Sequence, residues 1–163
     1  MDAETSMLLP RLTCLAFLAL SPLALAAPPS HFGTVMGSGL LCRSETSNRY
    51  FFDYMVQHFG QPYKREGGAY WFRTQDAMLW NTPILEVMVS DESFPYSFVG
   101  AVADTTPEKL EQAIQGQDGL QYAKIDSSRF PVRETKAGSR IVYFNTRSKI
   151  FCAKFKPLPP ALR

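Results

Sequence analysis

The sequence predicts an α+β domain with a mainly antiparallel sheet of five to seven strands, two helices and one disulfide. Three observations support this: two segments have helical periodicity and capping residues, several others are strand-like, and two cysteines remain in the exported part. The predicted order is helix, three strands, helix, three to four strands. Because the connections are short, we expect antiparallel pairing with the helices on one side of the sheet.

The first 26 residues have the pattern of a cleavable secretory signal peptide. Arg11 precedes the apolar run 12–20, and Ala24 and Ala26 supply the small residues that a signal peptidase requires. The run is shorter than the roughly 20 apolar residues that span a bilayer. We therefore expect cleavage near Ala26 and a periplasmic or secreted protein.

The remaining chain predicts a single domain over residues 27–156, followed by a flexible proline-rich tail at 157–163. Removal of the signal peptide removes Cys14 and leaves Cys42 and Cys152. An even number of cysteines in an exported chain indicates a disulfide. Closing such a long loop stabilises the fold by roughly 4 to 5 kcal/mol in the chain-entropy description.

The first predicted helix covers residues 45–59. Ser44 is its expected N-cap, and Gly60 with Pro62 ends it. Its apolar residues form a broad arc, so we expect the helix to be embedded against the sheet. Residues 27–34 are expected to form a flexible lead-in, and Gly37-Ser38-Gly39 a turn.

Three strands are predicted next, at residues 68–74, 83–90 and 97–103, with a turn at 91–93 between the last two. The second strand alternates between apolar and other side chains. The third is apolar on both faces, which is typical of a central strand.

The second predicted helix begins at Thr105-Thr106-Pro107-Glu108, which provides an N-cap, a first-turn proline and a capping-box glutamate. A narrow stripe of Leu110, Ala113 and Ile114 indicates a surface helix, and Gly116 is expected to end it. The remaining strands are predicted at 120–125, 140–145 and 150–156, with turns at 137–139 and 146–149.

Aromatic residues beside a pair of glycines form the first candidate binding site. Gly67 and Gly68 precede Tyr70 and Trp71, and Tyr63 lies shortly before them. One interpretation is a simple turn that leads into an aromatic strand. The other is a groove shaped by glycine and lined by Tyr63, Tyr70 and Trp71, which suits flat ligands, sugar rings or peptide strands.

Basic residues in the last 40 positions form the second candidate. Residues 124–163 contain 10 basic and 2 acidic side chains, whereas residues 27–123 contain 6 and 11. These basic side chains are either solvated hairpin tips or one surface for an anionic partner such as phospholipid, lipopolysaccharide or an acidic protein. The side chains concerned are Arg133, Lys136, Arg140, Arg147, Lys149, Lys154 and Lys156.

The sequence predicts no catalytic residue, no metal site and no cofactor. Gly37-Ser38-Gly39 lacks the glycine that a nucleophile elbow needs before it, and it is not a phosphate-binding loop. The exported part contains only His31 and His58, without neighbouring cysteines at zinc-ligand spacing. His58 is interpreted as a half-buried, hydrogen-bonded side chain.

The helix ending in Phe59-Gly60-Gln61-Pro62-Tyr63 is followed by a strand with Tyr70-Trp71-Phe72. This combination resembles the SmpA/BamE-type outer-membrane assembly lipoproteins and the related β-lactamase-inhibitor-like domains. The resemblance covers residues 59–72 and implies an architecture, without functional residues. The chain departs from the lipoprotein pattern because it has no lipobox cysteine.

Together these features predict an exported accessory protein that acts by binding a protein or an anionic envelope component, without catalysis. Nucleic acid is not an expected partner outside the cell, whereas peripheral contact with a membrane is compatible with the charge pattern. The alternatives are an inhibitor or immunity-type protein that blocks a cell-wall enzyme through a protruding loop, and, with less support, an envelope hydrolase.

Overall fold

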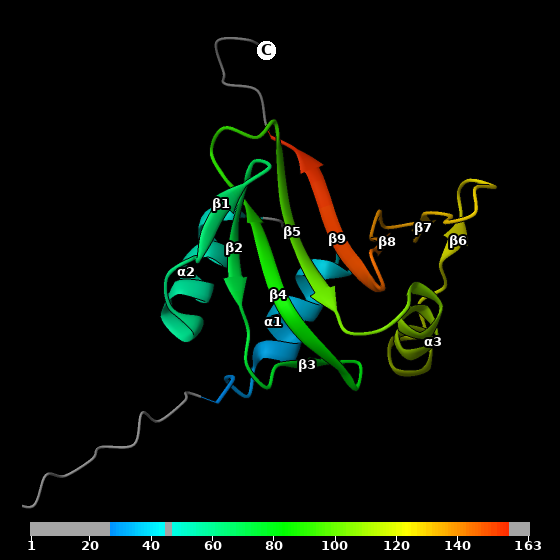
Figure 1. The fold of residues 1–163 in the computed structure, drawn as a ribbon, viewed down its shortest axis with the longest axis horizontal. Coiled ribbons are helices and arrows are strands. Elements are labelled where there is room, and N and C mark those ends of the chain that lie inside the picture. The colour runs from blue at the N-terminus through cyan, green and yellow to red at the C-terminus, as the bar shows by residue number, and fades with distance from the viewer. Residues whose placement is uncertain (1–26, 45–46, 157–163) are drawn as a thin grey trace, which may run out of the picture.

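The computed structural model describes residues 27–44 and 47–156, and these residues form an α+β fold with one antiparallel sheet (Figure 1). The predicted fold class is confirmed. Within the described ranges there are three helices and nine strands, more than the two helices and five to seven strands expected. The predicted signal peptide at 1–26 and tail at 157–163 lie outside the described residues.

The nine strands belong to one sheet in the order β1-β2-β4-β5-β9-β8-β7-β6, with the short β3 paired to β4. All pairings are antiparallel. The strands are β1 (Lys64–Glu66), β2 (Ala69–Arg73), β3 (Met78–Leu79), β4 (Thr82–Ser90), β5 (Tyr96–Ala103), β6 (Ala123–Lys124), β7 (Arg133–Glu134), β8 (Arg140–Phe144) and β9 (Arg147–Phe155).

The long strands agree with the prediction, and the differences concern short ones. β5 lies between β4 and β9, so the expectation of a central strand is confirmed. β1, β3 and β7 were not predicted, because two or three residues are too short to show an alternating pattern. The strand expected at 120–125 is reduced to β6, and the turn expected at 146–149 lies instead at 145–146, between β8 and β9.

An additional helix, α1 (Phe32–Leu40), replaces the expected lead-in and the turn at Gly37-Ser38-Gly39. Three glycines in this segment disfavour a helix in isolation. However, Phe32, Met36 and Leu40 recur every four residues on one face, and all three are buried. Packing also requires glycine here, since a Cβ on Gly39 would lie 2.5 Å from the ring of Phe51.

The two predicted helices are present with shifted ends. α2 (Asn48–Phe59) is capped by Ser47 rather than Ser44, and Gly60 ends it as expected. α3 (Pro107–Asp118) begins at the predicted Thr106 cap but continues past Gly116. Gly116 faces open space, whereas Gly119 adopts the left-handed conformation (φ 68°) that terminates helices.

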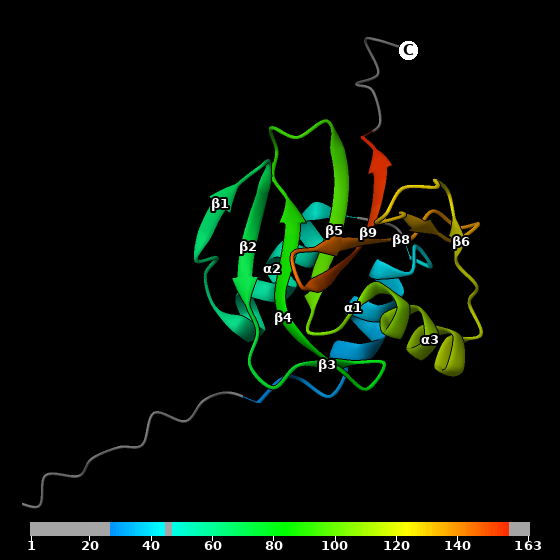
Figure 2. The same ribbon diagram turned by 45° about the vertical axis from the view of Figure 1, so that its right-hand side comes forward.

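The helices cover one face of the sheet, as Figures 1 and 2 show for α1 and α2, which lie behind it. α1 packs on β5 and β9, α2 on β2, β4 and β5, and α3 on β8 and β9. The side chains of all three helices meet the inward-facing residues of the sheet in one apolar core, which includes Phe51, Met55, Phe72, Val87, Val99, Leu110, Ile114 and Ile150.

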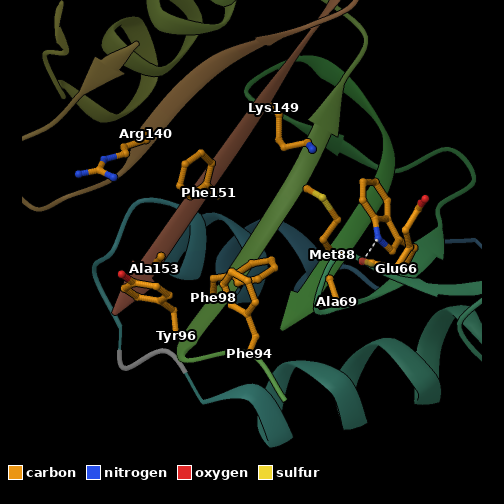
Figure 3. Close-up of a pocket in the computed structure, with 12 residues that line it drawn as sticks. Glu66, Ala69, Met88, Phe94, Tyr96, Phe98, Arg140, Lys149, Phe151 and Ala153 are labelled. Atoms are coloured by element: carbon orange, nitrogen blue, oxygen red, sulfur yellow. Dashed lines mark hydrogen bonds between the residues drawn. The ribbon is translucent and has the colours of Figure 1, made fainter. Parts of the chain in front are cut away.

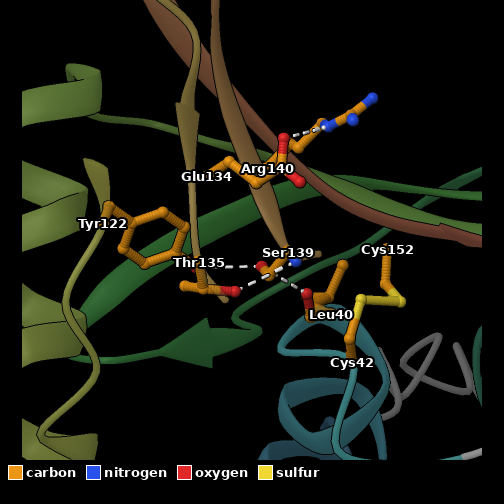
Figure 4. Close-up of a disulfide and its surroundings, with 8 residues drawn as sticks. All are labelled: Leu40, Cys42, Tyr122, Glu134, Thr135, Ser139, Arg140 and Cys152. Atoms are coloured by element: carbon orange, nitrogen blue, oxygen red, sulfur yellow. Dashed lines mark hydrogen bonds and ion pairs between the residues drawn. A yellow bond between two sulfur atoms is a disulfide. The ribbon is translucent and has the colours of Figure 1, made fainter. Parts of the chain in front are cut away.

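The predicted disulfide is confirmed: Cys42, directly after α1, is bonded to Cys152 in β9, with their Cα atoms 5.4 Å apart (Figure 4). A buried polar cluster lies beside it. The hydroxyl of Ser139 donates to the carbonyl of Leu40 at 2.7 Å and lies 2.9 Å from the hydroxyl of Tyr122. Both the disulfide and this cluster therefore hold the end of α1 against the C-terminal strands.

We expect loss of the disulfide to destabilise the fold. Replacing both Cys42 and Cys152 by serine should lower the free energy of unfolding by about 2 to 5 kcal/mol, because the unfolded chain regains the freedom that the closed loop removes. Urea unfolding of the variant and of the oxidised and reduced wild type measures this. The reduced wild type should match the variant, and equal stability of all three would contradict the prediction.

Candidate functional site

The face of the sheet opposite the helices carries an apolar groove of about 560 Å³ (Figure 3). Residues that pair across antiparallel strands point to the same side of a sheet. The pairing places Trp71, Met88, Gly100, Phe151 and Arg140 in one row on this face, crossing β2, β4, β5, β9 and β8. The groove crosses this row, and its further lining includes Ala69, Phe94, Tyr96, Phe98, Lys149 and Ala153.

Gly100 leaves room for the side chain of Met88 at the centre of this face. It lies at the centre of the row, between the side chains of Met88 and Phe151. A Cβ at this position would lie 2.7 Å from the terminal methyl of Met88 and 3.3 Å from the Cβ of Phe151. The terminal methyl of Met88 therefore occupies the space that a side chain on β5 would need here.

One wall of the groove is formed by Phe94, in the turn between β4 and β5. Gly67 and Gly68, both with positive φ, make the tight turn between β1 and β2. The ring of Phe94 occupies the space beside Gly68, where a Cβ would lie 2.3 Å from it. Phe94 also contacts Phe98 edge-on, with ring centroids 5.4 Å apart.

Asp91 holds this wall in place. Its carboxylate accepts hydrogen bonds from the backbone N–H and hydroxyl of Ser93, the N–H of Phe94 and the guanidinium of Arg65. The bond from the Ser93 hydroxyl, with the contribution of Arg65, lowers the pKa of buried Asp91 to about 2. The turn expected at 91–93 is thus held by hydrogen bonds to Asp91, and it positions one wall of the groove.

Lys149 is the charged side chain deepest in the groove. Its ammonium lies 4.0 Å from the ring centre of Phe144 and 5.1 Å from that of Trp71. Burial lowers the pKa of this half-buried lysine, partly opposed by the charge of Glu86. Glu86 itself accepts a hydrogen bond from the hydroxyl of Tyr63 at 2.6 Å.

The other charged side chains that line the groove have ion-pair partners. Glu66 pairs with Lys64 at 2.8 Å, and Arg140 pairs with Glu134 at 2.9 Å. The ammonium of Lys64 also lies 4.2 Å from the ring centre of Trp71. Among the described residues, Lys149 forms no ion pair or hydrogen bond and contacts aromatic rings instead.

The predicted binding residues separate into groups. Trp71, Arg140 and Lys149 line the groove, and Tyr63 is linked to this face through Glu86. Tyr70 lies on the helix-covered face, where its ring centre is 4.7 Å from that of Phe52. The two remaining residues lie elsewhere: Arg147 pairs with Asp104, and Lys154 borders a second hollow beside Phe155.

Several basic side chains of the C-terminal part are paired with acids or backbone carbonyls. Arg133 is only 2 % exposed and pairs with Glu108 and Glu111 of α3. Lys156 donates to the carbonyls of Asp91 and Glu92. Together with the pairs of Arg140 and Arg147, these contacts place the positive charges against acids and carbonyls on several faces.

The two histidines meet although they are distant in sequence. The rings of His31 and His58 are 5.2 Å apart, and both contact Tyr54. The hollow beside His58 is lined by Gln57, Arg73 and Gln75 among others, and no carboxylate is among its lining residues. In the ranges that the structure describes, no three His, Cys, Asp or Glu side chains are grouped to hold a metal ion.

Sequence reasoning missed most of the groove. Met88, Phe94, Phe98 and Phe151 were not predicted as site residues, yet they line the groove. The available signal was the apolar character of both faces of 97–103, combined with helices on one side only. Apolar residues on the second face then have no helix to cover them.

No known protein family, no curated protein and no solved structure matches this chain. Separately, none of the described helices has the length and hydropathy needed to cross a membrane.

We expect the stability of the protein to fall at acidic pH through Asp91. Its pKa of about 2 lies below the value of 3.8 for an unperturbed aspartate, so its charge stabilises the fold above about pH 4. This stabilisation should disappear as the pH falls from about 4 to 2. Asp91→Asn should therefore lower stability at neutral pH and flatten this part of the acid unfolding curve.

Asp53→Asn is the matched control, because Asp53 is exposed and pairs only weakly with Arg49. Urea unfolding monitored between about pH 7 and pH 2 measures the effect. If Asp91→Asn and Asp53→Asn gave the same profile as the wild type, Asp91 would not contribute as described.

Proposed function

We propose that this protein is an exported binding protein that takes a small apolar ligand into the groove on the open face of its sheet. The observation that carries the proposal is the apolar groove itself, in which the partly exposed Phe94, Phe98 and Phe151 surround the buried side chains of Met88 and Trp71. A concave site lined mainly by apolar and aromatic side chains is typical of a place where a small ligand binds.

The size and chemistry of the groove support this function. A volume of about 560 Å³ is within the range of small-molecule sites, which are mostly apolar with a few polar groups. Its charged lining residues are Glu66, Arg140 and Lys149, and its lining includes no histidine, cysteine or serine. This composition favours binding over catalysis. The Cys42–Cys152 disulfide is compatible with an exported protein.

The groove predicts binding of a neutral, polarity-sensitive dye. Nile red should bind the wild type at one saturable site, with a rise in fluorescence. Phe151→Glu, which places a charge in the apolar groove, should weaken this binding about tenfold or more. Fluorescence titration gives the dissociation constants, and circular dichroism checks that the variants are folded.

Phe130→Glu is the matched control, because Phe130 is an aromatic residue that is 56 % exposed and is not among the lining residues of the groove. It should bind Nile red as the wild type does. Equal binding by the wild type and both variants would show that the dye binds outside the groove and would contradict the proposal.

Export predicts a processed N-terminus. When the full chain is expressed in a secreting host, the mature protein should begin at Ala27 and contain no free thiol, because cleavage removes Cys14. N-terminal sequencing and alkylation followed by mass spectrometry test this. Recovery of an intact N-terminus with three reactive thiols would contradict export.

One observation favours the inhibitor as a second candidate. The loop at 125–132, between β6 and β7, is exposed over residues 125–130 and held in shape by Asp126, which accepts hydrogen bonds from the N–H groups of Ser128 and Val132. Ile125 and Phe130 are exposed on it. A preorganised loop of this kind suits insertion into an enzyme cleft. In that case Phe130→Glu, and not Phe151→Glu, would abolish inhibition of the partner enzyme.

A further inference from the structure

The groove is polarised along its length. On β9, Lys149, Phe151 and Ala153 follow one another on the open face, and their partners on β5 are Val102, Gly100 and Phe98. Figure 3 shows Lys149 at one end and Phe94, Tyr96 and Phe98 toward the other. Ala153 lies four positions after Lys149 on an extended strand, which corresponds to a distance of about 13 Å. A cation therefore stands at one end of an apolar channel.

Within residues 27–44 and 47–156, no protein group accepts a hydrogen bond from the ammonium of Lys149. Val102 and Val142 flank it on the neighbouring strands. Its nearest acid, Glu86, already accepts the hydroxyl of Tyr63. The rings of Phe144 and Trp71 attract the charge but accept no conventional hydrogen bond from it. An anionic group at this end would supply acceptors for the free N–H donors.

Two of the ligand classes expected from the sequence fit this groove poorly. Trp71 is only 9 % exposed, and the ammonium groups of Lys64 and Lys149 lie over its ring, so its face is not free to stack on a sugar. A peptide strand is recognised through unpaired backbone groups at a sheet edge. The groove instead lies on the face, between strands that pair with one another.

The apolar part suits a flexible chain. Met88, whose terminal methyl overlies Gly100, is an unbranched side chain that adapts to irregular ligands. Phe98 and Phe151 complete the channel without offering a polar partner. The channel therefore combines conformable apolar walls with one unpaired cation.

Building on the proposed function, we propose that the ligand is a free single-chain anionic amphiphile, with its acidic head group on Lys149 and its chain along β5 and β9. Charge complementarity at Lys149 and the apolar channel that leads away from it carry this assignment. Recognition then depends on the head-group charge, which distinguishes this ligand from a purely apolar molecule.

The test compares dodecanoate with dodecan-1-ol, which has the same chain without the charge. Both should displace Nile red from the wild type, dodecanoate more strongly. Lys149→Gln should weaken the binding of dodecanoate about 10- to 100-fold, which is the range for loss of a hydrogen bond to a charged group. The same variant should leave the affinity for dodecan-1-ol unchanged. Lys149→Arg should retain the preference for the acid.

Lys109→Gln is the matched control: it makes the same charge change at an exposed position on α3, away from the lining of the groove. It should leave both competitors unchanged. The head-group assignment would be overturned if Lys149→Gln weakened the binding of dodecanoate and dodecan-1-ol equally, or if it changed the binding of neither. The proposed function would still stand if Phe151→Glu abolished Nile red binding.

A second experiment distinguishes binding of a free amphiphile from binding of a bilayer surface. Vesicles of phosphatidylglycerol and phosphatidylcholine should not bind the protein in a manner that depends on Lys149. If such vesicles bound through Lys149 while dodecanoate did not compete with Nile red, the occupant would be a membrane surface and the proposal would be wrong.

Discussion

The packing of the helices against a single face of the sheet is the constraint on which the rest of this structure depends. Phe32, Met36 and Leu40 of α1 and Phe51 of α2 are buried with the inward residues of the central strands. Burial of these side chains supplies the main favourable term of folding. Because all three helices pack on the same face of the sheet, the outward residues of β2, β4, β5 and β9 remain without a helical cover.

This asymmetry explains how a small domain carries a groove of useful size. The apolar residues that face away from the helices sit on paired strands, so their backbone groups are satisfied and their positions are rigid. Gly100 leaves room for the side chain of Met88, and the Asp91 turn holds Phe94 as a wall of the groove. A preformed site loses little conformational freedom on binding, which favours affinity.

The distribution of charge follows from the same topology. The basic C-terminal strands are brought beside acidic residues that precede them in sequence: Arg133 meets Glu108 and Glu111 of α3, and Arg147 meets Asp104. These two arginines are thereby paired with acids from the first part of the chain. Lys149 differs because its neighbours on the open face are valines and aromatic rings, and no acid of the described residues pairs with it.

Local signals in the sequence were sufficient for the long elements. The Thr106 cap, Gly60 as a helix stop and the apolar segment 97–103 depend on neighbouring residues and were predicted correctly. The pairing of Cys42 with Cys152 followed from cysteine number and export, without any knowledge of the fold. Both kinds of inference rest on chemistry that operates within a short segment or on simple counting.

Tertiary packing decided the remaining features. Only contact with Phe51 and the sheet turns the glycine-rich segment 32–40 into a helix, because burial outweighs its poor propensity. The groove likewise required strand order and register, which bring Trp71, Met88, Gly100 and Phe151 together from four strands. Tyr70 and Trp71, adjacent in sequence, lie on opposite faces, since successive side chains of a strand alternate.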